Sequence, residues 1–128
     1  MKTKLFITLV VLFSASTYGH SQQIKPINSK EVTDMFQKDK KLVVLDVRTA
    51  DEFKAGHIKG AINIDIRQPD ALSKIDKLNH HAKYIVHCRT NHRSKVAAEH
   101  MAQNGFKNVY QMMDGFNGWS QNNLPIEK

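Results

Sequence analysis

The sequence predicts an α/β fold in three layers (α/β/α), a mainly parallel sheet with helices on both faces. Apolar segments of strand length alternate along the chain with segments that have helical periodicity. The apolar segments near the middle are continuous, which is typical of strands buried on both faces. Residues 22–128 are enough for one compact domain and too few for two.

The domain begins with an expected edge strand followed by a helix. The strand covers residues 24–27, and Pro26 places it at an edge because proline donates no hydrogen bond to a neighbouring strand. Ser29 is expected to cap a helix that runs to Phe36 and turns Val32 toward the core.

The remaining expected elements alternate between strands and helices. Gly56 ends one helix, and Gly105 ends another as a left-handed cap. Because ligands bind at the carboxyl ends of parallel strands, we expect the site there. The elements are a strand at 42–47, a helical turn at 50–55, a strand at 61–64, a helix at 69–78, a strand at 83–87, a helix at 93–104, a strand at 108–112 and a helix at 116–121.

Residues 1–21 have the pattern of a secretory signal peptide. Lys2 and Lys4 precede an apolar run at 5–13, and small residues follow. The run is shorter than the roughly 20 residues of a membrane span, which disfavours the alternative of an uncleaved anchor. We therefore expect an exported, periplasmic domain with no stable membrane insertion after cleavage.

The charge balance favours small anionic partners. The chain has 19 Lys and Arg residues against 12 Asp and Glu residues, a net charge of +7. These basic residues are scattered and do not alternate with aromatic residues, so no nucleic-acid partner is expected.

Cys88 is the only cysteine, so no internal disulfide can form. It follows the apolar strand 83–87 and precedes a short polar loop and a helix. A helix N-terminus favours anions and therefore the reactive thiolate. The alternative is a buried cysteine that acts as a small apolar residue. The local sequence favours the reactive thiol.

Four motifs resemble those of the rhodanese family and occur in the same order as in that family. They cover nearly all of the chain after residue 21. The motifs are Leu45-Asp46-Val47-Arg48, Glu52-Phe53 with Gly56-His57-Ile58-Lys59-Gly60-Ala61-Ile62-Asn63-Ile64, Cys88-Arg89-Thr90-Asn91-His92-Arg93-Ser94, and Asp114-Gly115-Phe116-Asn117-Gly118-Trp119.

The resemblance implies a rhodanese-like domain with a five-stranded parallel sheet and a sulfurtransferase activity. Thiosulfate or a similar anionic donor would supply sulfane sulfur, and Cys88 would carry it as a persulfide to a thiol, cyanide or protein acceptor. No metal and no organic cofactor are implied. The loop residues that would bind the substrate are Arg89, Thr90, Asn91, His92, Arg93 and Ser94.

Loop length separates the alternatives for this reaction. The loop from Cys88 to Arg93 has six residues. Related phosphatases and arsenate reductases of the same fold use a loop one residue longer, which admits a tetrahedral oxyanion. The shorter loop resembles the sulfur-transfer class. A non-enzymatic sulfur-carrier module remains open as the alternative.

Individual loop residues carry more specific expectations. Arg93 is expected both to attract the donor and to pair with a carboxylate that holds the loop, while Arg89 steers substrate at the mouth. Thr90 and Ser94 can each donate a hydroxyl to the sulfur or cap the following helix, and for Ser94 capping is the expected role. Asn91 stands where the family commonly has glycine, and it tolerates left-handed geometry. His92 is expected to face solvent.

Four further residues are expected to support the site. Asp46 and Arg48 end a buried strand, and burial of charge requires that they be paired. His57 is expected to stabilise the fold rather than move protons, and Trp119 to fill the core behind the loop. No histidine pair has persuasive metal-ligand spacing, so no zinc site is predicted.

Overall fold

The computed structural model describes residues 2–3, 12 and 23–128. The predicted signal peptide at residues 1–21 lies almost wholly outside the described residues. The elements are β1 (Ile24–Ile27), α1 (Ser29–Lys38), β2 (Val43–Asp46), α2 (Ala50–Ala55), β3 (His57–Ile58), β4 (Ile62–Asn63), α3 (Ala71–Asp76), β5 (Lys83–His87), α4 (His92–Gln103), β6 (Asn108–Met112), α5 (Gly115–Gln121) and β7 (Ile126–Glu127).

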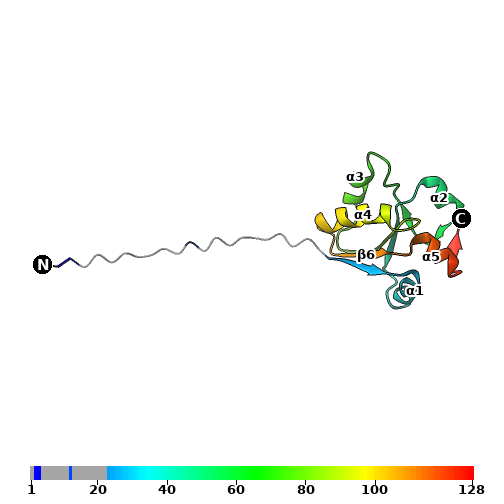
Figure 1. The fold of residues 1–128 in the computed structure, drawn as a ribbon, viewed down its shortest axis with the longest axis horizontal. Helices are drawn as coiled ribbons and strands as arrows, with labels where there is room; N and C mark the ends of the chain where they lie inside the picture. The colour runs from blue at the N-terminus through cyan, green and yellow to red at the C-terminus, as the bar shows by residue number, and fades with distance from the viewer. Residues whose placement is uncertain (1, 4–11, 13–22) are drawn as a thin grey trace.

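A five-stranded parallel sheet forms the middle layer, as predicted. Its strand order is β1-β6-β5-β2-β4, and β1 with its proline lies at an edge. In Figure 1, α3 and α4 lie on one side of this sheet and α1 lies on the other. The α/β/α arrangement is therefore confirmed.

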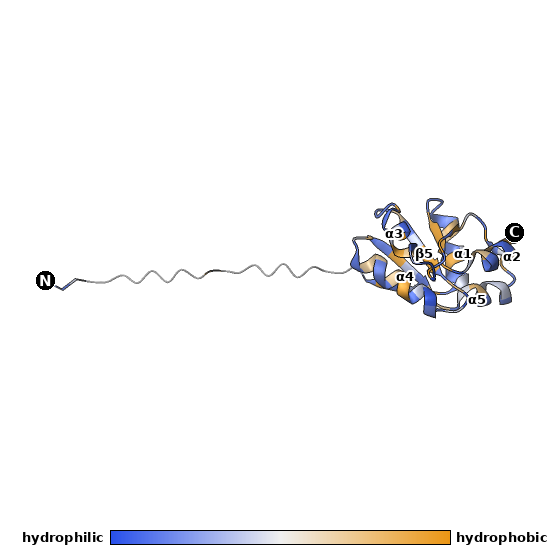
Figure 2. Cartoon of the chain, turned by 90° about the horizontal axis from the view of Figure 1, so that it is seen from above, coloured by the Kyte–Doolittle hydropathy of each residue, from blue (hydrophilic) through white to orange (hydrophobic). Residues whose placement is uncertain are grey.

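Two apolar cores separate the sheet from its helices. One core joins the sheet to α3 and α4 and includes Leu45, Val86 and Met101. The other joins it to α1 and α5 and includes Val32 and Ile85. Figure 2 shows the central strands as hydrophobic, with hydrophilic segments distributed over the outer elements. Because side chains alternate along a strand, neighbouring residues of β5 face opposite cores.

The strand order reverses beside β5. After β2 the chain continues to β4 on one side, and after β5 it continues to β6 on the other. The diverging connections leave room at the carboxyl ends of these strands, where ligands bind in open α/β sheets. β5 ends at His87, and Cys88 follows it directly. The fold therefore places the thiol at the expected position for a site.

The N-terminal cap of α1 differs from the prediction. Asn28, not Ser29, is the capping residue, and its side chain accepts from the backbone N–H of Glu31 in a reciprocal capping box. Ser29 lies inside the helix, fully buried, and donates its hydroxyl hydrogen to Asp114. A long-range partner thus takes the hydroxyl away from local capping.

Other element boundaries follow the prediction closely. The bounds of β1, β5 and β6 match, and Gly105 ends α4 with a left-handed φ of +86°. The helix expected at 69–78 is shorter, as is the strand expected at 61–64. The antiparallel pair β3–β7 was not predicted, because strands of two residues carry no periodic signal.

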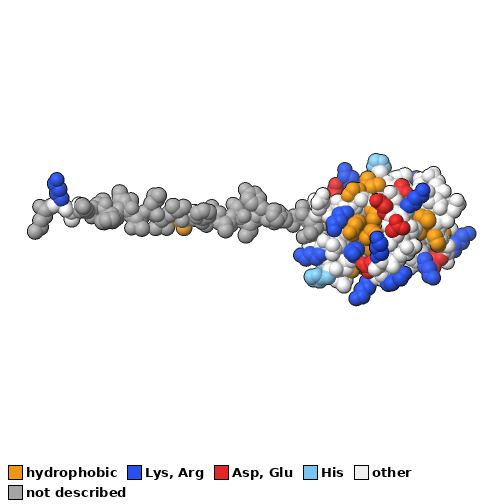
Figure 3. Space-filling view, turned by 90° about the horizontal axis from the view of Figure 1, so that it is seen from below, with side chains coloured by type: hydrophobic (Ala, Val, Ile, Leu, Met, Phe, Trp, Pro, Cys, Tyr) orange, Lys and Arg blue, Asp and Glu red, His pale blue; other side chains and the backbone are white. Residues whose placement is uncertain are grey.

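One face of the domain has its charges spread out rather than gathered in a patch. On the face shown in Figure 3, Lys and Arg side chains are dispersed among acidic and apolar ones. The scattered basic residues of the sequence therefore form no continuous stripe on this face.

Candidate active site

Cys88 lies at the carboxyl end of the central strand β5, just before α4 begins at His92. Its side chain is 1% exposed and belongs to the core beneath α3 and α4. The sulfur lies 3.6 Å from the hydroxyl oxygen of Ser94. An inert core cysteine would be buried too, so the groups around the sulfur decide its chemistry.

The backbone after Cys88 presents a run of N–H groups without acceptors. In the part of the chain that the structure describes, the N–H groups from Arg89 to Ser94 donate to no backbone or side-chain oxygen or nitrogen. They lead into α4, whose N-terminus carries partial positive charge. A run of free donors beside a thiol is the composition of an anion-binding loop.

The loop is held from behind by the segment that follows β6. The carbonyl oxygen of Cys88 accepts from the N–H of Phe116 at 2.8 Å, and that of Arg89 accepts from Asn117 at 3.1 Å. Gly115 makes this close approach possible, with a left-handed φ of +60°. A Cβ atom there would collide with the carbonyl oxygens of Arg89 and Thr90. Both loop carbonyls are thus engaged on the α5 side.

Replacement of Gly115 by alanine should therefore lower the free energy of unfolding by at least about 2 kcal/mol, because it adds overpacking to left-handed strain. Gly60→Ala is the matched control, since Gly60 has a φ of +78° but no atom within 4 Å of an added Cβ. The control should lose only about 1 kcal/mol in urea unfolding. Equal losses in the two variants would refute the collision.

Ser94 and Gln111 lie beside the sulfur. The Ser94 hydroxyl lies 3.2 Å from the carbonyl oxygen of Asn91, and the Gln111 amide donates to the same hydroxyl at 3.1 Å. The prediction that Ser94 caps α4 is wrong: Asn91 occupies the capping position, and its side chain makes no capping bond. Ser94 is instead buried inside the first turn of α4, facing Cys88.

The loop closes without left-handed geometry. Asn91 has a φ of −147°, so the left-handed geometry that asparagine tolerates is not needed at this position. Its side chain donates to the carbonyl oxygen of Met113 at 3.4 Å. Arg89, Thr90 and His92 are exposed at the rim, with His92 facing solvent as expected. An incoming anion would meet these three side chains first.

Arg93 pairs with Glu52 of α2. Both terminal nitrogens of its guanidinium donate to the carboxylate, at 2.7 and 3.1 Å. These bonds lower the pKa of Glu52 from 4.5 to about 2 and raise the pKa of Arg93. Glu52 is thus the carboxylate whose identity the sequence left open, and the pair ties α2 to the first turn of α4.

The Glu52–Arg93 pair predicts an acid-dependent stability. A lowered pKa in the folded state contributes stability above the ordinary value of 4.5, and the contribution is lost as the pH falls toward 2. Because the pair is partly exposed, we expect about 1–2 kcal/mol at neutral pH. In urea unfolding the native chain and Glu52→Gln should differ by this amount at neutral pH, and the difference should shrink as the pH falls from 4.5 toward 2. A difference that does not change with pH would contradict the assignment.

Asp46 and Arg48 form a buried ion pair at the end of β2, as the sequence predicted. Asp46 is fully buried and Arg48 is 3% exposed, with the Arg48 Nη2 atom 2.8 Å from the Asp46 Oδ2 atom. The same nitrogen donates to the carbonyl oxygen of Gly56 at 2.7 Å. The guanidinium also lies 3.9 Å from the centre of the Phe116 ring. The pair thus joins β2 to the segments around the loop.

His87 is a buried residue whose position the sequence did not assign to the site. Its Nδ1 atom lies 3.0 Å from the carbonyl oxygen of Cys88, and its Nε2 atom lies 3.6 Å from Asp46 without a hydrogen bond. Burial lowers the pKa of His87 below 6.5, while the Asp46 carboxylate acts in the opposite direction. The neutral ring is therefore favoured next to the Cys88 carbonyl.

His57 and Trp119 are structural contacts in this fold. His57 stacks on Phe53 at 3.7 Å and lies 3.3 Å from the carboxylate of Glu127. Trp119 is 2% exposed and donates to the carbonyl oxygen of Pro125. Its buried position is as predicted, but it packs in the core beneath α1, not in the core that contains Cys88.

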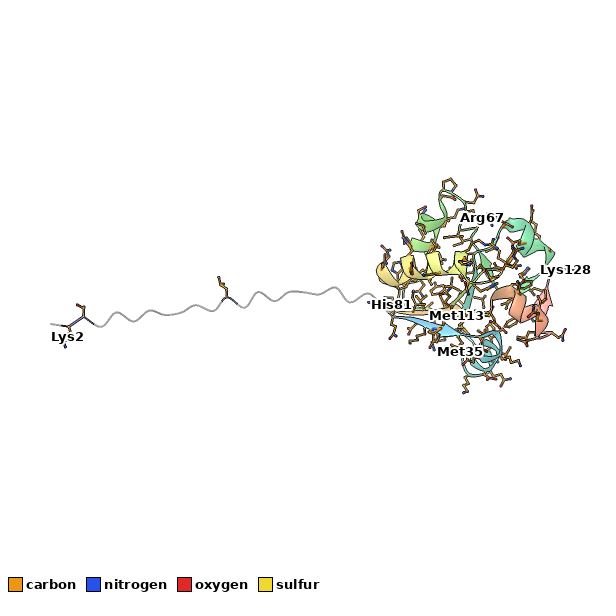
Figure 4. All side chains as sticks on the ribbon, viewed as in Figure 1. Lys2, Met35, Arg67, His81, Met113 and Lys128 are labelled. Atoms are coloured by element: carbon orange, nitrogen blue, oxygen red, sulfur yellow. The ribbon has the colours of Figure 1, made fainter. Side chains whose placement is uncertain are left out.

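The surface near the loop is hollowed on the β1 side. A hollow of about 530 Å³ is lined by residues that include His92, Lys95 and Met113. A larger hollow of about 670 Å³ includes His81, which Figure 4 shows on the opposite side of the domain from Lys128. The larger hollow is lined by residues at the amino ends of the strands, away from Cys88.

Metal centres and membrane-spanning helices are both absent from the part of the chain that the structure describes. Residues 2–3, 12 and 23–128 contain no group of three or more His, Cys, Asp or Glu side chains placed to hold a metal ion. Within these same residues, no helix combines the length and apolar character needed to cross a bilayer.

The fold and the loop define an α/β domain with a thiol at an anion-binding strand-to-helix junction. The model of the rhodanese-like domain matches residues 28–122, and the chain belongs to that family. It is similar to a rhodanese-related protein from Thermoplasma volcanium whose crystal structure is known, with 31% identity and a TM-score of 0.69 over 80% of this chain and 97% of the other.

Two plant proteins illustrate the curated relatives. Thiosulfate sulfurtransferase 16, chloroplastic, from Arabidopsis thaliana is 33% identical over 65% of this chain and 78% of its own length. Rhodanese-like domain-containing protein 14, chloroplastic, from the same plant is 27% identical over 83% of this chain and 66% of its own length. The chain spans only 51% and 34% of the length of two other curated relatives.

Proposed function

We propose that this protein is a sulfurtransferase that carries sulfane sulfur on Cys88 as a persulfide. The donor is an anion such as thiosulfate, and the acceptor is a thiol or, in vitro, cyanide. The observation that carries this proposal is the run of free N–H donors from Arg89 to Ser94 beside the single thiol. Those donors match the negative charge of the donor and of the persulfide.

The reaction divides into two balanced displacements. The Cys88 thiolate attacks the outer sulfur of thiosulfate, the S–S bond of the donor breaks, and sulfite leaves with the bonding electron pair. The persulfide anion that remains lies among the N–H groups of the loop. Cyanide then attacks the terminal sulfur and leaves as thiocyanate, which restores the thiolate. No external oxidant is consumed.

The exposed residues of the loop would attract the donor, whereas Arg93 would hold the loop in shape. Arg89 is exposed and would attract the donor from solution. Both terminal nitrogens of Arg93 donate to Glu52, so the main role of Arg93 is to hold the loop in place. Its positive charge also acts on the site from that position. Thr90 and His92 border the entrance.

A second candidate is a sulfur carrier that passes the persulfide to a protein partner. The lengths of several relatives favour it, because there the matched domain is only a part of a longer protein. The carrier would form the same persulfide on Cys88 but would release it slowly to small acceptors.

Export is a separate proposal. We infer from the pattern of residues 1–21 that the chain is secreted and that its mature form begins near residue 22. Expression in a bacterium, followed by fractionation and intact mass measurement, tests this. A full-length chain in the cytoplasmic fraction would contradict it.

One pair of measurements tests the transferase and separates the candidates. The protein is incubated with thiosulfate and examined by intact mass spectrometry for one added sulfur atom, and cyanide is then added and thiocyanate measured. Persulfide with rapid thiocyanate formation supports the transferase, whereas persulfide with slow release supports the carrier. A folded protein that forms neither product refutes both, and hydrolysis of an aryl phosphate instead would identify a phosphatase.

A further inference from the structure

Gln111 is a buried polar residue in a strand that is otherwise apolar on the same face. It is 6% exposed, and it lies on β6 two residues after the fully buried Val109. Its amide nitrogen donates to the carbonyl oxygen of Asn91 at 2.9 Å and to the hydroxyl oxygen of Ser94 at 3.1 Å. Both acceptors belong to the turn that holds Cys88, so the amide reaches the loop from outside it.

The Ser94 hydroxyl has one hydrogen and two neighbours that can accept it, the Asn91 carbonyl oxygen and the Cys88 sulfur once ionised, while the Gln111 amide donates to its oxygen. Its oxygen lies 3.6 Å from the Cys88 sulfur, 3.2 Å from the Asn91 carbonyl oxygen and 3.1 Å from the Gln111 nitrogen. While the sulfur is a thiol, it donates to Ser94, and Ser94 donates to Asn91. When the sulfur loses its proton, it becomes an acceptor and competes with Asn91 for the hydroxyl hydrogen.

Gln111 decides this competition. The Asn91 carbonyl oxygen accepts from the Gln111 amide at 2.9 Å and from the backbone N–H of Lys95 at 3.1 Å, so these two donors fill both of its lone pairs when the hydroxyl turns away. Without the Gln111 amide, one lone pair would be open to the Ser94 hydroxyl, and the hydroxyl would stay on Asn91. Hydrogen bonds to an ionised acceptor are also stronger than those to a neutral one.

We propose that Gln111 is a positioning residue that frees the Ser94 hydroxyl to donate to the Cys88 sulfur once that sulfur is ionised. The step moves no covalent bond; the hydroxyl only rotates from Asn91 to the sulfur. Gln111 thereby favours the thiolate, and in the proposed reaction it favours the persulfide anion as well. Only the second half of this inference rests on the proposed function.

Charged groups near the sulfur are left in place by a change at Gln111. Arg93 of α4 acts electrostatically on Cys88, and Glu52 of α2 and Asp65 act on Arg93 in turn. On the opposite face of the sheet lie His87 and the buried Asp46–Arg48 pair. None of these side chains contacts Gln111 by a hydrogen bond or ion pair within residues 23–128. A variant at Gln111 therefore isolates the hydrogen-bond effect.

The test is an ultraviolet titration of the thiolate in the full chain, with the spectrum of Cys88→Ser subtracted. The single cysteine makes the signal unambiguous. Gln111→Met keeps the length of the side chain but removes the amide, and it should raise the pH midpoint of thiolate formation by about one unit, a tenfold change. Ser94→Ala should raise it by a similar amount.

The double variant decides the mechanism. The double variant combines Gln111→Met with Ser94→Ala. If Gln111 acts through Ser94, this variant should raise the pH midpoint of thiolate formation no further than Ser94→Ala alone does. An unchanged midpoint in Gln111→Met, or a fully additive shift in the double variant, overturns the inference. Gln111→Leu repeats the measurement if the methionine variant fails to fold. A purely structural role would lower the melting temperature without moving the midpoint.

This experiment is independent of sulfur transfer, because the titration needs no donor. A protein that shows the predicted midpoints but forms no persulfide would refute the proposed function and leave the role of Gln111 standing. A protein that forms the persulfide with an unchanged midpoint in Gln111→Met would do the reverse.

Discussion

Replacement of Cys88 by serine is expected to lower the rate of thiocyanate formation from thiosulfate and cyanide by at least about a thousandfold. A serine hydroxyl is not ionised at neutral pH and forms no persulfide. The site should remain folded, because the exchange barely alters the volume beside Ser94 and the loop carbonyls keep their bonds to Phe116 and Asn117.

A relocated thiol provides the matched control for this prediction. Ser73 is exposed on α3, so Ser73→Cys combined with Cys88→Ser restores one thiol per chain outside the loop. This double variant should stay inactive, because its thiol lacks the N–H donors that follow Cys88. Recovery of activity would show that any exposed thiol suffices and would remove the loop from the mechanism.

Asp46→Asn is expected to have the largest effect on stability, a loss of about 3–5 kcal/mol in the free energy of unfolding. The substitution leaves the Arg48 guanidinium buried without its counter-charge, at a position where the arginine is 3% exposed. Urea unfolding followed by circular dichroism measures the loss. Because His87 borders both Asp46 and the Cys88 carbonyl, thiocyanate formation should fall as well.

Two comparison variants make the Asp46 prediction specific. Arg48→Met in the Asp46→Asn background removes the unpaired charge, so it should recover part of the lost stability. Asp70→Asn breaks an exposed pair with Lys74, in which both side chains are more than half exposed, and should have little effect. Equal losses for Asp46→Asn and Asp70→Asn would contradict the burial argument.

The sequence predicts best those elements whose signal lies within the element itself. The continuous apolar run before Cys88 marks β5 with its correct bounds, and Pro26 marks an edge strand, because each signal lies within the element itself. The cap of α1 was misplaced by one residue, because the partner that engages Ser29 is Asp114, 85 positions away.

In the candidate site, too, some features follow from the local sequence and others only from the fold. Spacing places Cys88 and its polar loop at a strand-to-helix junction, and the need to pair buried charge predicts the bond between Asp46 and Arg48. Gln111 and Glu52 were not assigned roles. Gln111 stands out in the sequence as a polar residue within a largely apolar strand. Its contact with Ser94, 17 positions away in the sequence, is visible only in the folded structure.

The sequence by itself determined the order of the strands and helices apart from β3 and β7, the single thiol directly after β5 and the short polar loop that follows it. These follow from periodicity, spacing and residue type, which act over a few neighbouring positions. Tertiary structure alone decided that Arg93 pairs with Glu52, that Ser94 faces the sulfur instead of capping α4, and that Cys88 is buried. Each of these depends on packing between segments distant in the chain, and a single hydroxyl or guanidinium takes whichever partner the fold brings within reach.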